Sequence, residues 1–174
     1  MIEFFIRFLA VWFVVYPVVT LLHELGHGIA ALMVVKDRPI TCMLGTDPEK
    51  AQLTLNLGPR LRILLNLGTG FFGRCVIGGS EPFSKSQTIL ISLAGPLVSL
   101  GMGLFFFLLP SFENSYLNVL RFLFLSCAML QFVATIIPIR YLFGGYKGRP
   151  SDGLRVWRAL RQKKDPSVEG STVV

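Results

Sequence analysis

The feature that most constrains the fold is a run of 21 residues, 89–109, that contains no charged side chain. An α-helix rises about 1.5 Å per residue, and the hydrocarbon core of a bilayer is about 30 Å thick. A run of this length therefore predicts a transmembrane helix. The composition agrees, because 52% of the residues are hydrophobic and only 16% are charged, below the ~25% typical of soluble domains.

Two further apolar stretches predict two more spans, which places the three spans at about 4–35, 87–109 and 117–139. Between the first two, residues 36–85 bring charges, glycines and short apolar runs. The segment 52–57 alternates apolar and polar residues with period two, which is typical of a strand. We interpret 36–85 as a small β-sheet or pair of hairpins at the membrane surface.

The C-terminal part predicts an interfacial helix at 151–163, with Ser151 as its N-cap and with apolar residues on one side of a cationic surface. The tail 165–174 is polar and is expected to be disordered. The fold class that follows is mainly α: a polytopic membrane protein with a three-span helical core and a small β region. Residues 1–164 would form this single core.

Basic residues predict the orientation in the membrane. Seven lysines and arginines lie in 36–85 and eight lie in 140–174, out of 17 in the chain. The positive-inside rule then puts the N-terminus outside and the C-terminus in the cytoplasm of a cell membrane. We attribute the net charge of +7 to topology and to anionic lipid headgroups rather than to nucleic acid. A cleaved signal peptide is the competing interpretation of the N-terminus, and its hardly basic start argues against it.

The motif that carries chemistry is H-E-x-x-H at His23, Glu24 and His27, and these are the only two histidines of the chain. Positions i and i+4 of a helix project from nearly the same face, so both imidazoles can reach one metal ion. Glu24 can then act as the general base. The alternative is a hydrogen-bonded polar cluster that fixes helix packing. Because ionisable residues inside an apolar span are costly, we favour a functional zinc site.

A catalytic zinc takes three protein ligands. No other histidine exists, and the three cysteines show no C-x-x-C pairing, so the third ligand should be a carboxylate. Asp152 follows the third span on the same predicted side as the histidines, and it is the best candidate. An N-terminal helix charge favoured by the helix dipole explains Asp152 equally well.

The order of three motifs resembles the site-2 protease family of intramembrane zinc metalloproteases, in particular its short bacterial members. These motifs are His23–His27, Ala94-Gly95-Pro96 and Asp152-Gly153. The resemblance implies one zinc ion per chain on His23, His27 and Asp152, with Glu24 as base and acid. It also implies that a substrate segment pairs with an exposed strand of the β region.

The same resemblance points, more weakly, to substrate-binding residues on the second and third spans. These are Gly95, Pro96, Ser99 and Thr135. The family often has asparagine where Ser99 and Thr135 stand, so substrate contacts at these two positions would differ from those of the family.

The leading functional hypothesis is therefore hydrolysis of peptide bonds in membrane-tethered polypeptides near the cytoplasmic face. The alternative is a non-proteolytic membrane binding or regulatory protein of the same fold, and a regulatory partner is compatible with either. An ion transporter is disfavoured, because the second and third spans carry few polar residues and no inverted repeat.

Overall fold

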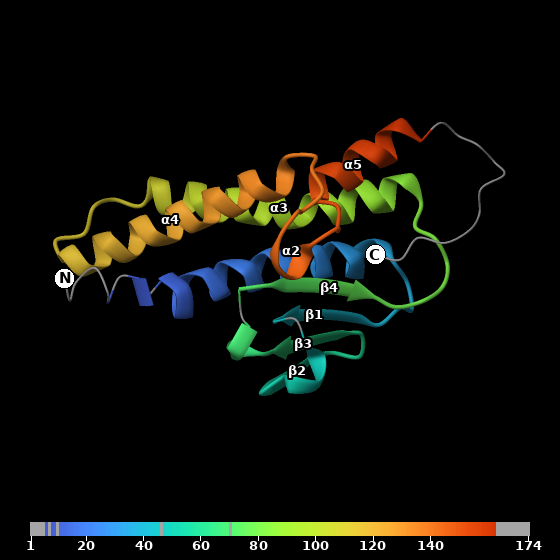
Figure 1. The fold of residues 1–174 in the computed structure, drawn as a ribbon, viewed down its shortest axis with the longest axis horizontal. Coiled ribbons are helices and arrows are strands. Elements are labelled where there is room, and N and C mark those ends of the chain that lie inside the picture. Colours follow the sequence, from blue (N-terminus) through green and yellow to red (C-terminus); the bar gives the residue numbers. More distant parts are fainter. Residues whose placement is uncertain (1–5, 7, 10, 46, 70, 163–174) are drawn as a thin grey trace.

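The computed structural model describes residues 6, 8–9, 11–45, 47–69 and 71–162. Three long helices and one small sheet form the fold (Figure 1). The helices are α2 (Tyr16–Val34), which follows a π-helical turn η1 (Val11–Val15), α3 (Lys85–Leu108) and α4 (Ser115–Ile136). The prediction of a mainly helical chain with a sheet between its first two long helices is confirmed. The predicted tail at 165–174 and part of the predicted first span lie outside the described residues.

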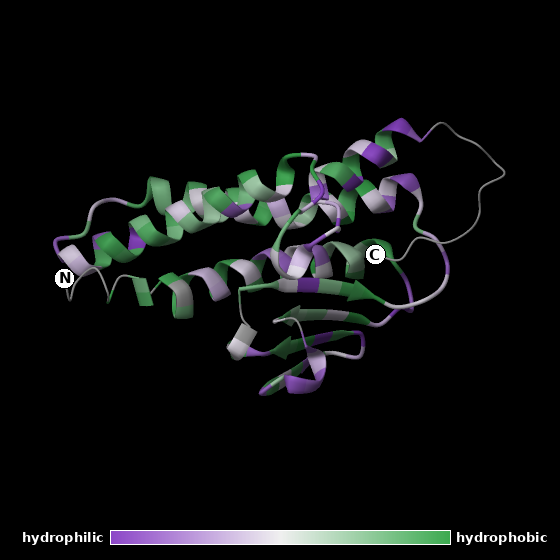
Figure 2. Cartoon of the chain, in the orientation of Figure 1, coloured by the Kyte–Doolittle hydropathy of each residue, from purple (hydrophilic) through white to green (hydrophobic). Residues whose placement is uncertain are grey.

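All three long helices are long and apolar enough to cross a membrane. Many of their apolar side chains stay exposed and are not buried by packing within the chain. On α4, Phe122 and Leu130 are each 64% exposed. Hydrophobic residues make up most of the length of α3 and α4 (Figure 2). A helix that is apolar all round is typical of a membrane span.

Local chemistry sets the helix ends, and it corrects the predicted boundaries. A capping box at Ser84, whose hydroxyl accepts from the Gln87 amide, starts α3 two residues before the predicted position. The third span was predicted to reach 139, but α4 ends at Ile136. Pro138 disfavours helical backbone at the residue before it, and Ile137 is extended accordingly.

The sheet contains β1 (Ile40–Leu44), β2 (Leu53–Leu57), β3 (Leu61–Leu65) and β4 (Gly73–Ile77) in the order β2-β3-β1-β4. Only β2 and β3 form a hairpin. β1 pairs with β3 in parallel and with β4 antiparallel, with Cys42 opposite Cys75. The outcome is one mixed sheet rather than a pair of hairpins, and β4 is one of its edges.

Helix α2 lies between the sheet and the other long helices (Figure 1). A buried cluster joins α2, the sheet and α3, and it consists of Ala30, Ala31, Val35, Ile40, Cys42, Leu61, Ile77 and Ile91. The short helix α5 (Asp152–Arg161) packs on α3, and it is shorter at both ends than the predicted 151–163. This packing brings the start of α5 next to the middle of α2.

Candidate metal centre

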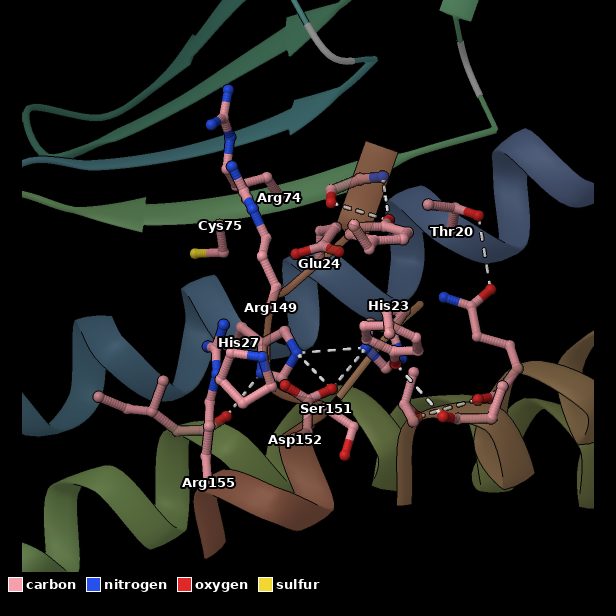
Figure 3. Close-up of a pocket in the computed structure, with 18 of the residues that line it drawn as sticks. Thr20, His23, Glu24, His27, Arg74, Cys75, Arg149, Ser151, Asp152 and Arg155 are labelled. Carbon is pink, nitrogen blue, oxygen red and sulfur yellow. Dashed lines mark hydrogen bonds and ion pairs between the residues drawn. The ribbon is translucent and has the colours of Figure 1, made fainter. Parts of the chain in front are cut away.

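Helix α2 presents both histidines toward α3 and α5. His23 is 2% exposed and His27 is 7% exposed. Their Nε2 atoms lie 3.2 Å apart, as expected for two imidazoles one turn apart on one helix face. Figure 3 shows the two rings converging on one point, with Asp152 opposite.

Asp152 reaches the histidines because the chain turns back sharply after α4. Ser151 caps α5, and its hydroxyl also accepts from the Ile139 amide at 3.1 Å. Gly153 then passes so close to α4 that a Cβ on it would lie 1.8 Å from the Ile136 carbonyl oxygen. The Ser-Asp-Gly sequence thus combines a cap, a candidate metal ligand and a close helix contact. Asp152 is also the first residue of α5, where the helix dipole favours an acidic side chain.

Three atoms form a nearly equilateral triangle. The Oδ2 atom of Asp152 lies 3.3 Å from His23 Nε2 and 3.4 Å from His27 Nε2, and the third edge is 3.2 Å. Ligands about 2.0–2.1 Å from a tetrahedral ion are separated by about 3.3–3.4 Å. These three buried residues could therefore hold one metal ion with little rearrangement.

The other ring nitrogens orient the imidazoles. His27 Nδ1 donates to the Ile91 carbonyl at 2.6 Å, since a carbonyl oxygen can only accept. This bond leaves the lone pair of neutral His27 on Nε2, directed at the centre of the triangle. His23 Nδ1 lies 2.9 Å from Ser99 Oγ. A purely hydrogen-bonded cluster would need a proton on both Nε2 atoms, each directed at Asp152.

Charge also favours a cation at this point. When His27 is protonated, its attraction and the hydrogen bonds from both histidines outweigh the effect of burial and hold the pKa of Asp152 below its ordinary range. A metal ion on the ring nitrogens would take the place of those protons. The carboxylate is therefore ionised at neutral pH, as a metal ligand must be.

Space for the centre depends on Gly95 of α3. A Cβ on Gly95 would lie 2.3 Å from His27 Nε2 and 2.8 Å from His23 Nε2. Any larger residue would push the imidazoles out of the triangle.

Glu24 lies beside the triangle but outside it. It is 7% exposed, and it lies on the β4 side of the histidines (Figure 3). Gly73 of β4 makes room for it, since a Cβ there would lie 2.8 Å from Glu24 Oε1. The carboxylate borders a cavity of about 360 Å³ that also touches His23, His27 and Asp152.

The edge of β4 forms one wall of this cavity. Phe72 accepts from the Gly45 amide and Gly78 donates to Pro39, so the even-numbered residues of this stretch point their backbone groups at β1. The backbone groups of Gly73, Cys75 and Ile77 alternate with these and point away from the sheet. Within the described part of the chain, Cys75 and Ile77 have no backbone partner on that side.

Tyr146 occupies the remaining position on this edge. Its hydroxyl accepts from the Gly73 amide at 2.5 Å and donates to the Gly73 carbonyl at 2.9 Å. Burial, and then the charge of Glu24, raise the pKa of Tyr146, so the hydroxyl keeps its proton at neutral pH. The loop after α4 thus covers one end of the β4 edge.

The four weaker predictions are placed differently from one another. Gly95 and Ser99 contact the histidines, and Pro96 is fully buried. Only Thr135 lines the cavity, and its hydroxyl donates to the Gln131 carbonyl of its own helix. Whether any of the four contacts a substrate stays a prediction.

Sequence reasoning missed several lining residues. The Ile91 carbonyl carries no side-chain signal, and Tyr146 stands in a glycine-rich loop whose path the sequence does not reveal. Three arginines, Arg74, Arg149 and Arg155, gather on the His27 side of the cavity, away from Thr20 (Figure 3). In the sequence these arginines indicate only the membrane topology.

In comparisons with known proteins, no protein-family model matches this chain and no curated protein matches it. The resemblance to the site-2 protease family therefore stays a prediction from the three sequence motifs.

Proposed function

We propose that this chain is an intramembrane zinc metallopeptidase of the site-2 protease type, which hydrolyses membrane-tethered polypeptides near the cytoplasmic face. The observation that carries the proposal is the buried triangle of His23, His27 and Asp152 beside Glu24, in a cavity bordered by the open edge of β4. Metal ligands, an acid–base group and a place for an extended peptide thus occur together.

Zinc is the metal that this donor set favours. Two neutral imidazoles and one carboxylate in a tetrahedral arrangement leave a fourth position open, which is the pattern of catalytic zinc sites. Bound there, the ion supplies a Lewis acid that polarises a peptide carbonyl and acidifies water. The carbonyl of Ile91 and the hydroxyl of Ser99 keep the two rings aimed at that ion.

Glu24 is the acid–base group in this proposal. It sits next to His23 on α2 and faces the same cavity. There it takes a proton from the attacking water and delivers it to the leaving amine. Gly73 serves this role indirectly, because its lack of a side chain lets the carboxylate approach β4.

The substrate segment adds to β4 as a strand. A helix hides its peptide carbonyls in its own hydrogen bonds, whereas a strand presents alternate carbonyls for attack. Cys75 and Ile77 offer outward backbone groups for this pairing, and both line the cavity. The hydrogen bonds between the Tyr146 hydroxyl and the Gly73 backbone limit the added strand at the Gly73 end of β4.

The membrane setting of the proposal rests on α2, α3 and α4. The C-terminal end of α2, the N-terminal end of α3 and the C-terminal end of α4 lie on one side, together with α5 (Figure 1). The distribution of lysine and arginine supports a cytoplasmic position for this side in a bacterial cell membrane, with the N-terminus outside. The exposed apolar surfaces of the three helices then face lipid.

The proposal is tested by incubating zinc-loaded protein in detergent with a fluorogenic unfolded protein such as labelled casein. We expect slow hydrolysis that a zinc chelator abolishes and that Glu24→Gln lowers at least about 100-fold, since the ligands remain but the base is lost. Zinc content measured on the same samples is the control. One zinc per chain with equal hydrolysis by wild type and Glu24→Gln would contradict the proposal and favour a non-proteolytic binding protein.

A further inference from the structure

A second cavity adjoins the metal centre. It has a volume of about 730 Å³ and lies between β4, the N-terminal half of α3 and helix α5. Arg74, Arg149 and Arg155 line both cavities, as do Ile91 and Pro150. The two cavities are therefore neighbours, and these five residues border both of them.

The walls of the second cavity are strongly cationic. Four arginines line it from three separate segments: Arg74 on β4, Arg149 in the loop before α5, and Arg155 and Arg158 on α5. The described lining contains no aspartate or glutamate. Arg155 faces the charges of Glu24 and Asp152 at the shared end. A concave surface lined by one sign of charge attracts ligands of the opposite sign.

Arg149 and Arg158 have no acidic partner in the part of the chain that the structure describes. Not every arginine of α5 lines the cavity. Arg161 stacks on Trp157 instead, with its guanidinium carbon 3.9 Å from the ring centroid. Arg158 therefore lines the cavity, whereas Arg161 three residues later does not.

The edge of β4 leads into this cavity. Tyr146 covers the Gly73 end, so an added strand pairs with Cys75 and Ile77. Toward the Ile77 end, the second cavity is lined by Val76, Phe83 and Thr88 and by the four arginines. A strand seated on β4 would run past the metal centre and carry its next residues among the guanidinium groups.

We propose that the second cavity is a subsite for acidic side chains of the polypeptide substrate, on the side of the scissile bond that lies away from Tyr146. This inference rests on the proposed peptidase function. Aspartate and glutamate suit the site, because a guanidinium fork pairs with a carboxylate through two parallel hydrogen bonds. The substrate class is thus a membrane-tethered polypeptide with a short acidic segment next to its cleavage site.

An anionic lipid headgroup is the competing occupant. The cavity lies between the sheet and two helices and shares lining residues with the cavity of the metal centre, whereas a headgroup meets the outer face of an interfacial helix. On α5 that outer face carries Trp157 and Leu160, which are 43% and 57% exposed, together with Arg161. The arrangement assigns Arg161 to headgroups and the four cavity arginines to the substrate.

The test measures peptide binding separately from cleavage. The probe is a fluorescein-labelled extended peptide, Val-Thr-Val-Thr-Val followed by Glu-Ser-Glu, and its twin has Gln-Ser-Gln. Both are titrated into zinc-loaded Glu24→Gln protein in a neutral maltoside detergent, with anisotropy as the readout. We expect the acidic peptide to bind about 10-fold more tightly, and the difference to shrink at high salt.

The matched variants are Arg149→Gln with Arg158→Gln on the cavity wall and Arg161→Gln on the outer face of α5. The double variant is expected to bring the ratio of the two peptides to about 1, and Arg161→Gln is expected to leave it near 10. Equal binding of both peptides by the starting protein would overturn the inference. The inference would also be overturned if short-chain phosphatidylglycerol, but not phosphatidylcholine, displaced the acidic peptide and if Arg161→Gln lost binding. This result would assign the cavity to lipid.

Cleavage of the same two peptides by wild-type protein separates this inference from the proposed function. Arginine-dependent binding without hydrolysis of either peptide would count against the peptidase and leave the acidic subsite standing. Hydrolysis of both peptides at equal rates and with equal affinities would remove the acidic subsite and leave the peptidase.

Discussion

The two walls of the central cavity are built in opposite ways. On the wall made by α2, α3 and α5, each group that faces the metal-binding triangle has a partner: Ser99 for His23, and the Ile91 carbonyl for His27. On the wall made by β4 and the loop before α5, backbone groups of Cys75 and Ile77 and the side chain of Arg149 have no partner among the described residues.

The difference indicates what each wall is for. A site for a small ion gains from rigid ligands whose orientation is fixed in advance, because little rearrangement is then needed on binding. A site for a polypeptide must instead leave hydrogen-bonding groups for the incoming chain. We call the wall made by α2, α3 and α5 the complete wall, because its groups have their partners without a substrate. We call the wall made by β4 and the loop before α5 the open wall, because it leaves hydrogen-bonding groups for a substrate.

The largest expected effect comes from crowding the complete wall. Gly95→Ala places a methyl group where the two Nε2 atoms converge, and we expect zinc affinity to fall by about 100-fold or more. Competition with a fluorescent zinc chelator measures this. Gly101→Ala is the control on the same helix, since a Cβ there meets nothing within 4 Å. An affinity unchanged in Gly95→Ala would show that the triangle is not where zinc binds.

A smaller effect is expected from loosening one ligand on the same wall. Ser99→Ala removes the partner of His23 Nδ1 but leaves the helix packing intact, and loss of such an orienting bond typically weakens metal binding about 10-fold or more. Ser92→Ala, also buried on α3, is the matched control. If both serine variants bound zinc as the wild type does, the orienting role of Ser99 would be wrong.

The smallest effect belongs to the open wall. Tyr146→Phe removes the hydroxyl from Gly73 but keeps the ring contact with Phe72. The lost bonds cost about 1 kcal/mol of stability, and a longer stretch of β4 becomes available. We expect the Gln-containing peptide to bind about 2- to 5-fold more tightly, with zinc affinity unchanged.

The control for this loop is Tyr141→Phe, whose lost hydroxyl bonds the Ala134 carbonyl and not β4. Weaker peptide binding in Tyr146→Phe would show instead that the hydroxyl belongs to the substrate site.

The sequence predicted the complete wall better than the open one. Helix periodicity is enough to bring His23 and His27 together. Because the chain has no other histidine and no C-x-x-C motif, the choice of a third ligand narrows to a carboxylate. Alternation at 52–57 likewise predicted β2. These features depend on local chemistry, which one chain displays directly.

The open wall depends on contacts between distant segments. The edge position of β4 follows from the order β2-β3-β1-β4, and short strands with similar apolar patterns do not reveal that order. Arg74 and Arg158 are far apart in sequence, and they line the same cavity only because α5 folds back onto α3. Tyr146 likewise reaches Gly73 through a loop whose turns rely on glycines at positive φ, Gly144 and Gly148.

The central claim is the three-ligand zinc site, and the metal content of detergent-purified protein tests it most directly. Wild type is compared with His23→Ala and Asp152→Ala after reconstitution with zinc and removal of the excess. The account predicts about one zinc per chain in the wild type and loss of zinc in both variants. A wild type that takes up no zinc, or zinc retained in Asp152→Ala at the wild-type level, would contradict it.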